Sequence, residues 1–152
     1  MLCIRYGHGD DPRAAPRVPV ALSFPAAPEV VSIEVDALID TASPWTILPG
    51  RANRVGQELW RVELETPKST VGAEIPLVGL ERIALGESEP RLWPIFLVSV
   101  EVAGIRSAGE AVFVPGRQEV TLGRSCLSAF KLSLDFERHE LTLERAPGPR
   151  RG

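Results

Sequence analysis

The stretch Ala37-Leu38-Ile39-Asp40-Thr41-Ala42-Ser43-Pro44-Trp45-Thr46-Ile47-Leu48-Pro49 places one acidic residue between two apolar runs. A carboxylate at the end of a buried strand is unfavourable unless it is paired or hydrogen-bonded. The small residues after Asp40 allow other backbone segments to approach closely. One interpretation is a strand-end aspartate that caps a turn at Thr41 and Ala42. The other is a functional carboxylate.

The sequence on either side of this stretch predicts short strands. Residues 33–37 alternate apolar and polar side chains, as a half-buried strand does. Alternation of this kind or short apolar runs predict strands at 18–23, 33–39, 59–64, 92–102, 111–114, 120–122, 132–136 and 140–143. One helix is expected over residues 126–130, capped by Ser125. The 13 Gly and 14 Pro residues exceed the combined total of roughly 18 expected for this length. The predicted fold class is therefore all-β with one short helix near the C-terminal end.

A second segment, Val120-Thr121-Leu122-Gly123-Arg124-Ser125-Cys126-Leu127, leads from an apolar run into Gly123 and Arg124. Together with the stretch around Asp40, it resembles the retropepsin-like (retroviral-type) aspartic protease family. That family carries an apolar–apolar–Asp–Thr/Ser–Gly motif and, downstream, an apolar–apolar–Gly–Arg element. Segments 134–136 and 141–143 are similar to the closing strands of bacterial single-domain members. The resemblance spans about residues 17–145.

The resemblance implies a small closed β-barrel of the retropepsin-like acid protease type that acts as a homodimer, with Asp40 as the catalytic residue. Aspartic proteolysis needs two facing carboxylates, and each chain supplies one, so two Asp40 side chains would meet on a twofold axis. Like charges this close share one proton. The ionised carboxylate would activate a water molecule against an extended polypeptide substrate, and the protonated one would polarise the scissile carbonyl. No cofactor and no metal are expected.

The resemblance also implies supporting roles for neighbouring residues. Thr41 would hydrogen-bond across the twofold axis. The residues expected to support the active-site loop are Thr41, Ala42 and Ser43. Structural roles near the site fall to Leu122, Gly123 and Arg124. The Arg124 guanidinium would brace the active-site loop or the dimer contact through a charge-assisted hydrogen bond. The alternative for Arg124 is a surface arginine that follows a strand.

A substrate-covering flap is expected between the two motifs. Residues 69–85 predict a hairpin with its turn near Val71-Gly72-Ala73-Glu74. By resemblance this hairpin would close over the substrate and exclude water. The residues expected to contact the substrate are therefore Val71, Gly72, Ala73 and Glu74.

Ala42 stands where the family usually has glycine. If this position requires a positive φ, alanine is strained by roughly 1–2 kcal/mol. At negative φ it is tolerated. Three functions remain open: an aspartic-type endopeptidase; a catalytically weak or inactive peptide-binding or dimerisation module of the same fold; and an unrelated small β-barrel in which Asp40 caps a turn.

Charge and composition exclude other classes of function. With 17 Lys+Arg and 20 Asp+Glu, the net charge of −3 disfavours nucleic-acid binding and membrane anchoring. Cys3 and Cys126 are too few for a disulfide framework, so free thiols are expected. His8 with Asp10 and Asp11 is rejected as a metal site because no further ligand accompanies it.

The chain is expected to hold a single domain. Residues 1–16 predict a flexible N-terminal arm, 17–146 the protease-like domain, and 147–152 a flexible C-terminal tail. No stretch approaches the ~20 apolar residues of a membrane helix, and no secretory signal is visible at the N-terminus. A cytoplasmic location is therefore expected.

Overall fold

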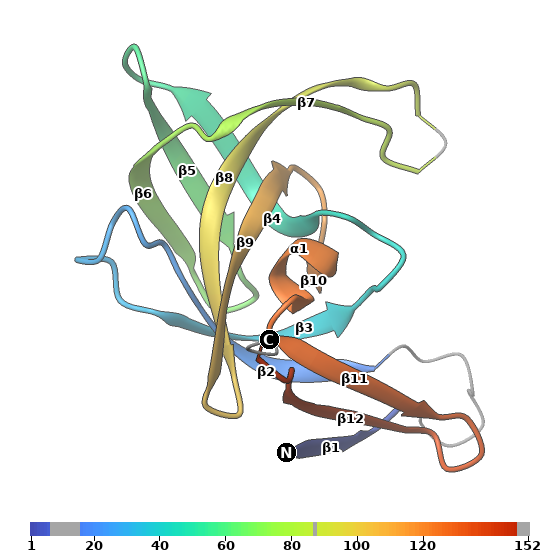
Figure 1. Cartoon of the computed structure of the whole chain (residues 1–152). Helices are drawn as coiled ribbons and strands as arrows, with labels where there is room; N and C mark the ends of the chain where they lie inside the picture. The colour runs from blue at the N-terminus through green and yellow to red at the C-terminus, as the bar shows by residue number, and fades with distance from the viewer. Residues whose placement is uncertain (7–15, 87, 149–152) are drawn as a thin grey trace.

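The computed structural model describes residues 1–6, 16–86 and 88–148 (Figure 1). Strands make up most of these residues, with one short helix. The elements are β1 (Leu2–Arg5), β2 (Arg17–Ser23), β3 (Ile33–Ile39), β4 (Thr46–Arg54), β5 (Leu59–Glu65), β6 (Thr70–Pro76), β7 (Gly79–Ile83), β8 (Arg91–Val102), β9 (Ile105–Val114), β10 (Val120–Leu122), α1 (Arg124–Leu127), β11 (Phe130–Asp135) and β12 (Glu140–Arg145).

Six strands close into a barrel. Their order is β10-β3-β2-β8-β9-β4, and β4 pairs again with β10 to complete the ring. Two pairings, β10 with β3 and β4 with β9, are parallel. The parallel pairs bring together strands far apart in the sequence, which no local hairpin can do. The predicted all-β class with a closed barrel and one short helix is confirmed.

Alternating apolar residues fill the barrel. On β2, Val18, Val20 and Leu22 are at most 2% exposed and point inward. Phe96 and Phe113 pack edge to face with ring centroids 5.7 Å apart, and the Phe24 ring stacks with Phe113 at a centroid distance of 6.3 Å. Burial of each such side chain contributes about 1.5–3 kcal/mol relative to leaving it in water.

Strand β4 leaves the barrel at Gly50. Residues 46–49 pair with β9, whereas residues 50–54 pair with β5. Gly50 has φ +149°, and a Cβ at this position would collide with the carbonyl oxygen of Glu63. Only glycine lets β5 come this close, so β4, β5 and β6 continue outward as an extension of the barrel (Figure 1).

The chain ends form a separate three-stranded sheet in the order β1-β12-β11. The prediction of a flexible arm over residues 1–16 is wrong at residues 2–5, which form β1. Leu2 and Ile4 lie opposite Leu143 and Leu141, so their side chains join one apolar face. The partner strand lies about 140 residues away, which a local pattern cannot reveal. Residues 7–15 lie outside the described part.

The predicted helix begins earlier than expected. Helix α1 starts at Arg124 with Gly123 as its N-cap, so the prediction that Ser125 caps the helix is wrong. Ser125 Oγ instead donates a hydrogen bond to the carbonyl oxygen of Glu110, 2.8 Å away. In the described residues, no helix has the length and apolar character needed to cross a membrane. Of the predicted C-terminal tail, residues 147 and 148 have no regular structure and the rest lie outside the described part.

Candidate active site

The loop that carries Asp40 passes across the end of a neighbouring strand. Strand β3 ends at Ile39 and β4 begins at Thr46, yet the two do not pair with each other. Strand β10 lies between them, parallel to β3 and antiparallel to β4. The loop over residues 40–45 must therefore cross the C-terminal end of β10, where Gly123 and Arg124 follow. The two sequence motifs thus meet in space.

Backbone hydrogen bonds hold this crossing together. Asp40 N–H donates to the carbonyl oxygen of Leu122 at 3.0 Å, which extends the β3–β10 ladder by one bond. Arg124 N–H donates to the Ser43 carbonyl at 2.8 Å, and Ser125 N–H to the Pro44 carbonyl at 3.2 Å. These donors are the first free N–H groups of α1, which no helical carbonyl can satisfy. The loop therefore serves as the cap of the helix.

Gly123 allows the crossing because it has no side chain. A Cβ at Gly123 would collide with the carbonyl group of Trp45 and would lie 2.8 Å from the Ser43 carbonyl oxygen. Gly123 N–H donates to Thr46 Oγ1 at 3.1 Å, and Thr46 is fully buried. The glycine is thus explained by close packing against the Asp40 loop rather than by an unusual backbone angle.

The Asp40 carboxylate is half-buried at the start of the loop. Its Oδ1 accepts a hydrogen bond from Ala42 N–H at 3.0 Å, so it caps the turn as one interpretation of the sequence proposed. Among the described residues, no hydrogen bond or ion pair reaches the second oxygen, Oδ2. One oxygen orients the carboxylate and the other remains open, so capping and chemistry use different atoms.

Ala42 fits its position without backbone strain. The described non-glycine residues with positive φ are Ala103 and His139, so Ala42 has a negative φ. Thr41 and Ala42 are exposed, whereas Ser43 is half-buried and its Oγ donates to the Trp45 carbonyl at 2.7 Å. The backbone strain of an alanine with positive φ is therefore absent at Ala42.

The Arg124 guanidinium does not brace the loop within one subunit. Its side chain is exposed and makes no ion pair or hydrogen bond with any residue described in the structure. The backbone N–H of Arg124, not its charge, holds Ser43. The expected bracing role for the side chain is therefore wrong for the loop, because the side chain points into solvent beyond the helix start.

The predicted flap is in the wrong place. Val71, Gly72, Ala73 and Glu74 lie in the middle of β6, opposite residues 61–64 of β5. The actual turn joins β5 to β6, where Thr66 Oγ1 accepts from Ser69 N–H at 3.0 Å. Gly72 is a strand residue whose missing side chain leaves room for the Arg61 guanidinium. A glycine with no positive φ was mistaken for a turn residue.

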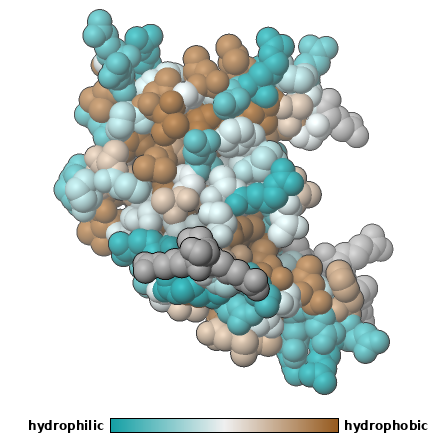
Figure 2. Space-filling model, viewed as in Figure 1, coloured by the Kyte–Doolittle hydropathy of each residue, from teal (hydrophilic) through white to brown (hydrophobic). Residues whose placement is uncertain are grey.

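A different hairpin, β7–β8, extends over the end of the barrel that carries the Asp40 loop (Figure 1). Its last pair is Ile83 with Arg91, and the described residues 84–86 and 88–90 follow and precede this pair towards the tip. Figure 2 shows the surface hollowed beneath this overhanging hairpin. The turn signal was present in Gly86, Ser88 and Pro90. It was missed because residues 79–83 were assigned to the preceding hairpin.

A second hydrophobic cluster joins this hairpin to the Asp40 loop. The inward face of the hairpin contributes Ile83, Trp93 and Ile95, and Trp45 packs against them from the end of the loop. The remaining members are Ile47, Val112 and Val114, with Leu85 at the margin. The Arg91 guanidinium lies 4.4 Å from the centre of the Trp93 ring. Hairpin and loop are therefore packed on one apolar base.

The Cys126 thiol lies buried beneath the loop and supports a chemical prediction. Burial raises the pKa of this thiol above its usual value, and hydrogen bonds with the Thr46 and Ser125 side chains offset this only in part. Cys3, by contrast, is exposed. Because thiolates react and thiols do not, we expect a disulfide reagent at mildly alkaline pH to modify Cys3 rapidly and Cys126 only after unfolding. Titration of native and denatured protein measures this, and rapid modification of both thiols would contradict the packing described here.

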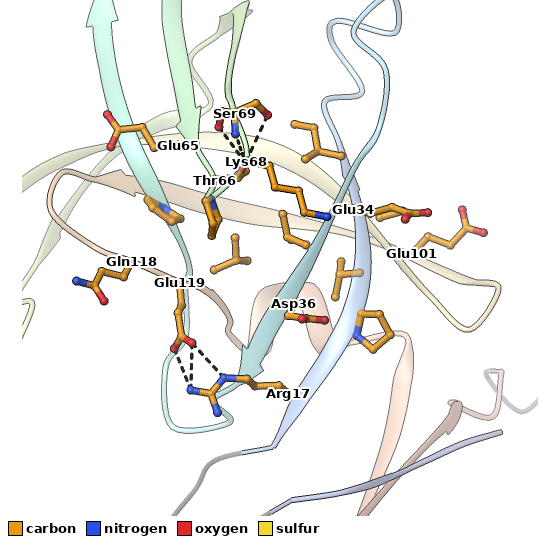
Figure 3. A pocket seen from close by; sticks show the side chains of 18 of the residues that line it. Arg17, Glu34, Asp36, Glu65, Thr66, Lys68, Ser69, Glu101, Gln118 and Glu119 are labelled. Carbon is orange, nitrogen blue, oxygen red and sulfur yellow. Dashed lines mark hydrogen bonds and ion pairs between the residues drawn. The ribbon is translucent and has the colours of Figure 1, made fainter.

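A groove of about 890 Å³ lies elsewhere on the barrel (Figure 3). The β5–β6 turn, the β8–β9 turn and the first halves of β2 and β3 surround it. Glu34, Asp36 and Glu101 lie on its rim, and Arg17 is already paired with Glu119 at 3.0 Å. None of its lining residues belongs to the Asp40 loop or to the Leu122–Arg124 segment.

The described residues hold no group of three His, Cys, Asp or Glu side chains that could bind a metal ion. His8, Asp10 and Asp11 lie outside the described part.

Comparison with known proteins shows the fold alone. No protein-family model matches the chain, and no curated protein matches it. Among solved structures, the chain is similar to Lpg0085, a Legionella pneumophila protein of unknown function (DUF785). The TM-score is 0.55 at 13% sequence identity, over 74% of this chain and 83% of the other.

Proposed function

We propose that this chain is an aspartic-type endopeptidase of the retropepsin-like family that works as a homodimer. The observation that carries the proposal is the crossing of the Asp40 loop over the end of β10. There, Gly123 and Arg124 fix the loop through backbone contacts. An acidic residue held rigidly at a barrel end, with one oxygen open, has the preorganisation that catalysis requires. A turn cap alone would not need this support.

The proposed chemistry uses one Asp40 carboxylate from each subunit. The two side chains face each other across a twofold axis and hold one proton between them, because two negative charges this close repel. The ionised carboxylate takes a proton from water, and the resulting hydroxide attacks the scissile carbonyl carbon. The protonated carboxylate donates its proton to the carbonyl oxygen. The other carboxylate then passes the proton it took from water to the amine nitrogen as the C–N bond breaks.

The β7–β8 hairpin takes the role of the substrate cover in this proposal. It overhangs the same end of the barrel as the Asp40 loop and shares a hydrophobic cluster with it. An extended polypeptide lying between hairpin and loop would pair its backbone with strand edges and place side chains in the hollow. The hairpin would also exclude water that does not react.

Ala42 motivates the competing function of an inactive peptide-binding or dimerisation module. Because Ala42 has a negative φ, backbone strain at this residue gives no reason to expect an inactive protein. Its methyl group is exposed and adds bulk only where substrate or the partner loop would approach. The two functions differ in whether bound peptide is cut.

A cleavage assay on the full chain tests the proposal. We expect hydrolysis of extended peptides at about pH 4–6, where a carboxylate pair holds one proton, and inhibition by a statine-type compound. Mass spectrometry of the products and sedimentation of the protein give the two readouts. A dimer that binds peptide without cutting it would establish the inactive module instead. A monomer that neither binds nor cuts peptide would favour the third function, an unrelated small β-barrel in which Asp40 caps a turn.

A further inference from the structure

Strand β11 has an open edge. It is the outer strand of the three-stranded sheet β1-β12-β11, and no described residue pairs with its other side. Such an edge presents unpaired N–H and C=O groups that can accept another strand. Natural proteins usually protect an edge of this kind.

The sequence of this edge is self-complementary. Residues 130–136 read Phe-Lys-Leu-Ser-Leu-Asp-Phe, which is symmetric about Ser133 apart from the exchange of Lys131 for Asp135. If two copies pair antiparallel about Ser133, apolar residues oppose apolar residues and each Lys131 opposes an Asp135. Opposite charges directly across an antiparallel pair are favourable, whereas like charges are not.

The exposure of the strand fits such a pairing. The apolar stripe begins with Phe130, only 7% exposed, but Leu134 is 47% exposed, and Phe136, just after the strand, is 76% exposed. Lys131, Ser133 and Asp135 alternate with the stripe and are exposed. The stripe is therefore covered at one end of β11 and uncovered at the other, where a second copy would place its own stripe.

We propose that β11 pairs antiparallel with β11 of a second copy, centred on Ser133, to form a six-stranded sheet β1-β12-β11-β11-β12-β1. This inference rests on the homodimer of the proposed function and adds the register of its interface. Each Lys131 lies opposite the partner's Asp135, so the interface holds two such pairs.

Lys131 and Asp135 already contact neighbouring groups of their own chain. Lys131 Nζ lies 3.6 Å from Glu144 Oε1 on β12. Asp135 Oδ1 accepts from the N–H groups of Glu137 and Arg138, and Arg138 Nε lies 3.9 Å from Asp135 Oδ2. All of these contacts are exposed, so each is weak. The partner charges can add to them without breaking a buried pair.

A charge exchange tests the register. Lys131→Asp places a carboxylate opposite the partner's Asp135, and Asp135→Lys places two ammonium groups in opposition. Each single variant is expected to raise the dimer dissociation constant at least about tenfold, because two pairs change sign. The double variant Lys131→Asp/Asp135→Lys restores attraction and should return within about threefold of the wild type. Lys68→Asp, on the β5–β6 turn, makes the same charge change away from β11 and should have no effect.

A disulfide tests the same register without relying on charge. Residues directly opposite in an antiparallel pair have Cα atoms about 4.5–5.5 Å apart, within the range that a disulfide spans. In a Cys3→Ser background, Ser133→Cys is expected to give a covalent dimer on mild oxidation. Ser128→Cys, equally exposed but before β11, should remain unlinked.

The outcomes separate this inference from the proposed protease. A wild-type chain that cleaves peptide as a dimer, with no response to the charge exchange and no Ser133→Cys cross-link, overturns the register and leaves the protease. A cross-linked dimer that cleaves nothing supports the interface and overturns the protease. A wild-type chain that stays monomeric at high concentration overturns the interface. This holds also if a different protein is found to bind the β11 edge.

Discussion

Asp40→Asn is expected to abolish peptide hydrolysis while leaving the fold intact. The amide cannot act as a general base on water, and loss of such catalysis lowers the rate by about 10²–10⁴-fold or more. The Asn carbonyl oxygen can still accept the hydrogen bond from Ala42 N–H that Asp40 Oδ1 accepts at 3.0 Å. The free energy of unfolding should therefore change by less than about 0.5 kcal/mol. Initial cleavage rates and a denaturant melt measure the two effects.

The matched control is Asp36→Asn. Asp36 lies on β3, the strand that leads into the Asp40 loop, is exposed, and makes no hydrogen bond or ion pair with the described residues. The change removes the same charge four residues earlier and should leave hydrolysis unchanged. Equal loss of activity in both variants would show that net charge, rather than the Asp40 carboxylate, matters.

Mixing subunits extends this experiment to the dimer. If each site takes one carboxylate from each chain, equal amounts of wild-type and Asp40→Asn protein form mixed dimers that lack one of the pair. Activity should then fall to about half that of the wild-type protein alone at the same amount. Activity that is unaffected by the variant would place the whole site in a single subunit and contradict the proposed dyad.

Gly123→Ala is expected to lower the stability of the fold strongly. The added methyl group would occupy the position of the Trp45 carbonyl, and both surrounding segments are backbone, which cannot rotate away. Overpacking of this kind costs typically 1–3 kcal/mol and sometimes more, and we expect about 3 kcal/mol. For a chain of this length, that corresponds to a melting temperature about 6–12 °C lower. Activity should fall with it, since the same contact holds the Asp40 loop.

Gly79→Ala provides the comparison for this variant. Gly79 is the first residue of β7, as Gly123 is the first residue after β10. Gly79 has no positive φ, and no atom lies within 4 Å of a Cβ added there. Its substitution should leave stability within about 0.5 kcal/mol of the wild type. A Gly123→Ala protein as stable as the Gly79→Ala protein would mean that the loop crossing is looser than the structure describes.

Much of the fold follows from local pattern. The alternation at the start of β3 predicts a strand because neighbouring side chains of a strand point to opposite faces. Short apolar runs predict β2 and β8. The predicted boundaries 18–23, 33–39, 92–102 and 120–122 agree with the strands to within one residue. The loop after Ile39 was also predicted, since an aspartate followed by small residues interrupts two apolar runs.

The largest errors concern strand partners. A hairpin over residues 69–85 was expected to turn near Gly72, but residues 70–76 form one strand that pairs with β5, and residues 79–83 pair with β8. Alternation states which face of a strand is buried and carries no information about its neighbour. For the same reason β1 was missed, since only its pairing with β12 makes Leu2 and Ile4 part of an apolar face.

By itself, the sequence determined that this chain is built of short strands, with one aspartate at the end of a buried strand and a glycine–arginine pair before a short helix. Tertiary structure alone decided that β10 lies between β3 and β4, so that these two motifs touch, and that β7–β8 is the hairpin over them. The physical reason is that strand formation depends on side chains a few residues apart. Strand pairing depends on closing loops of up to about 140 residues, whose outcome is set by the shared core.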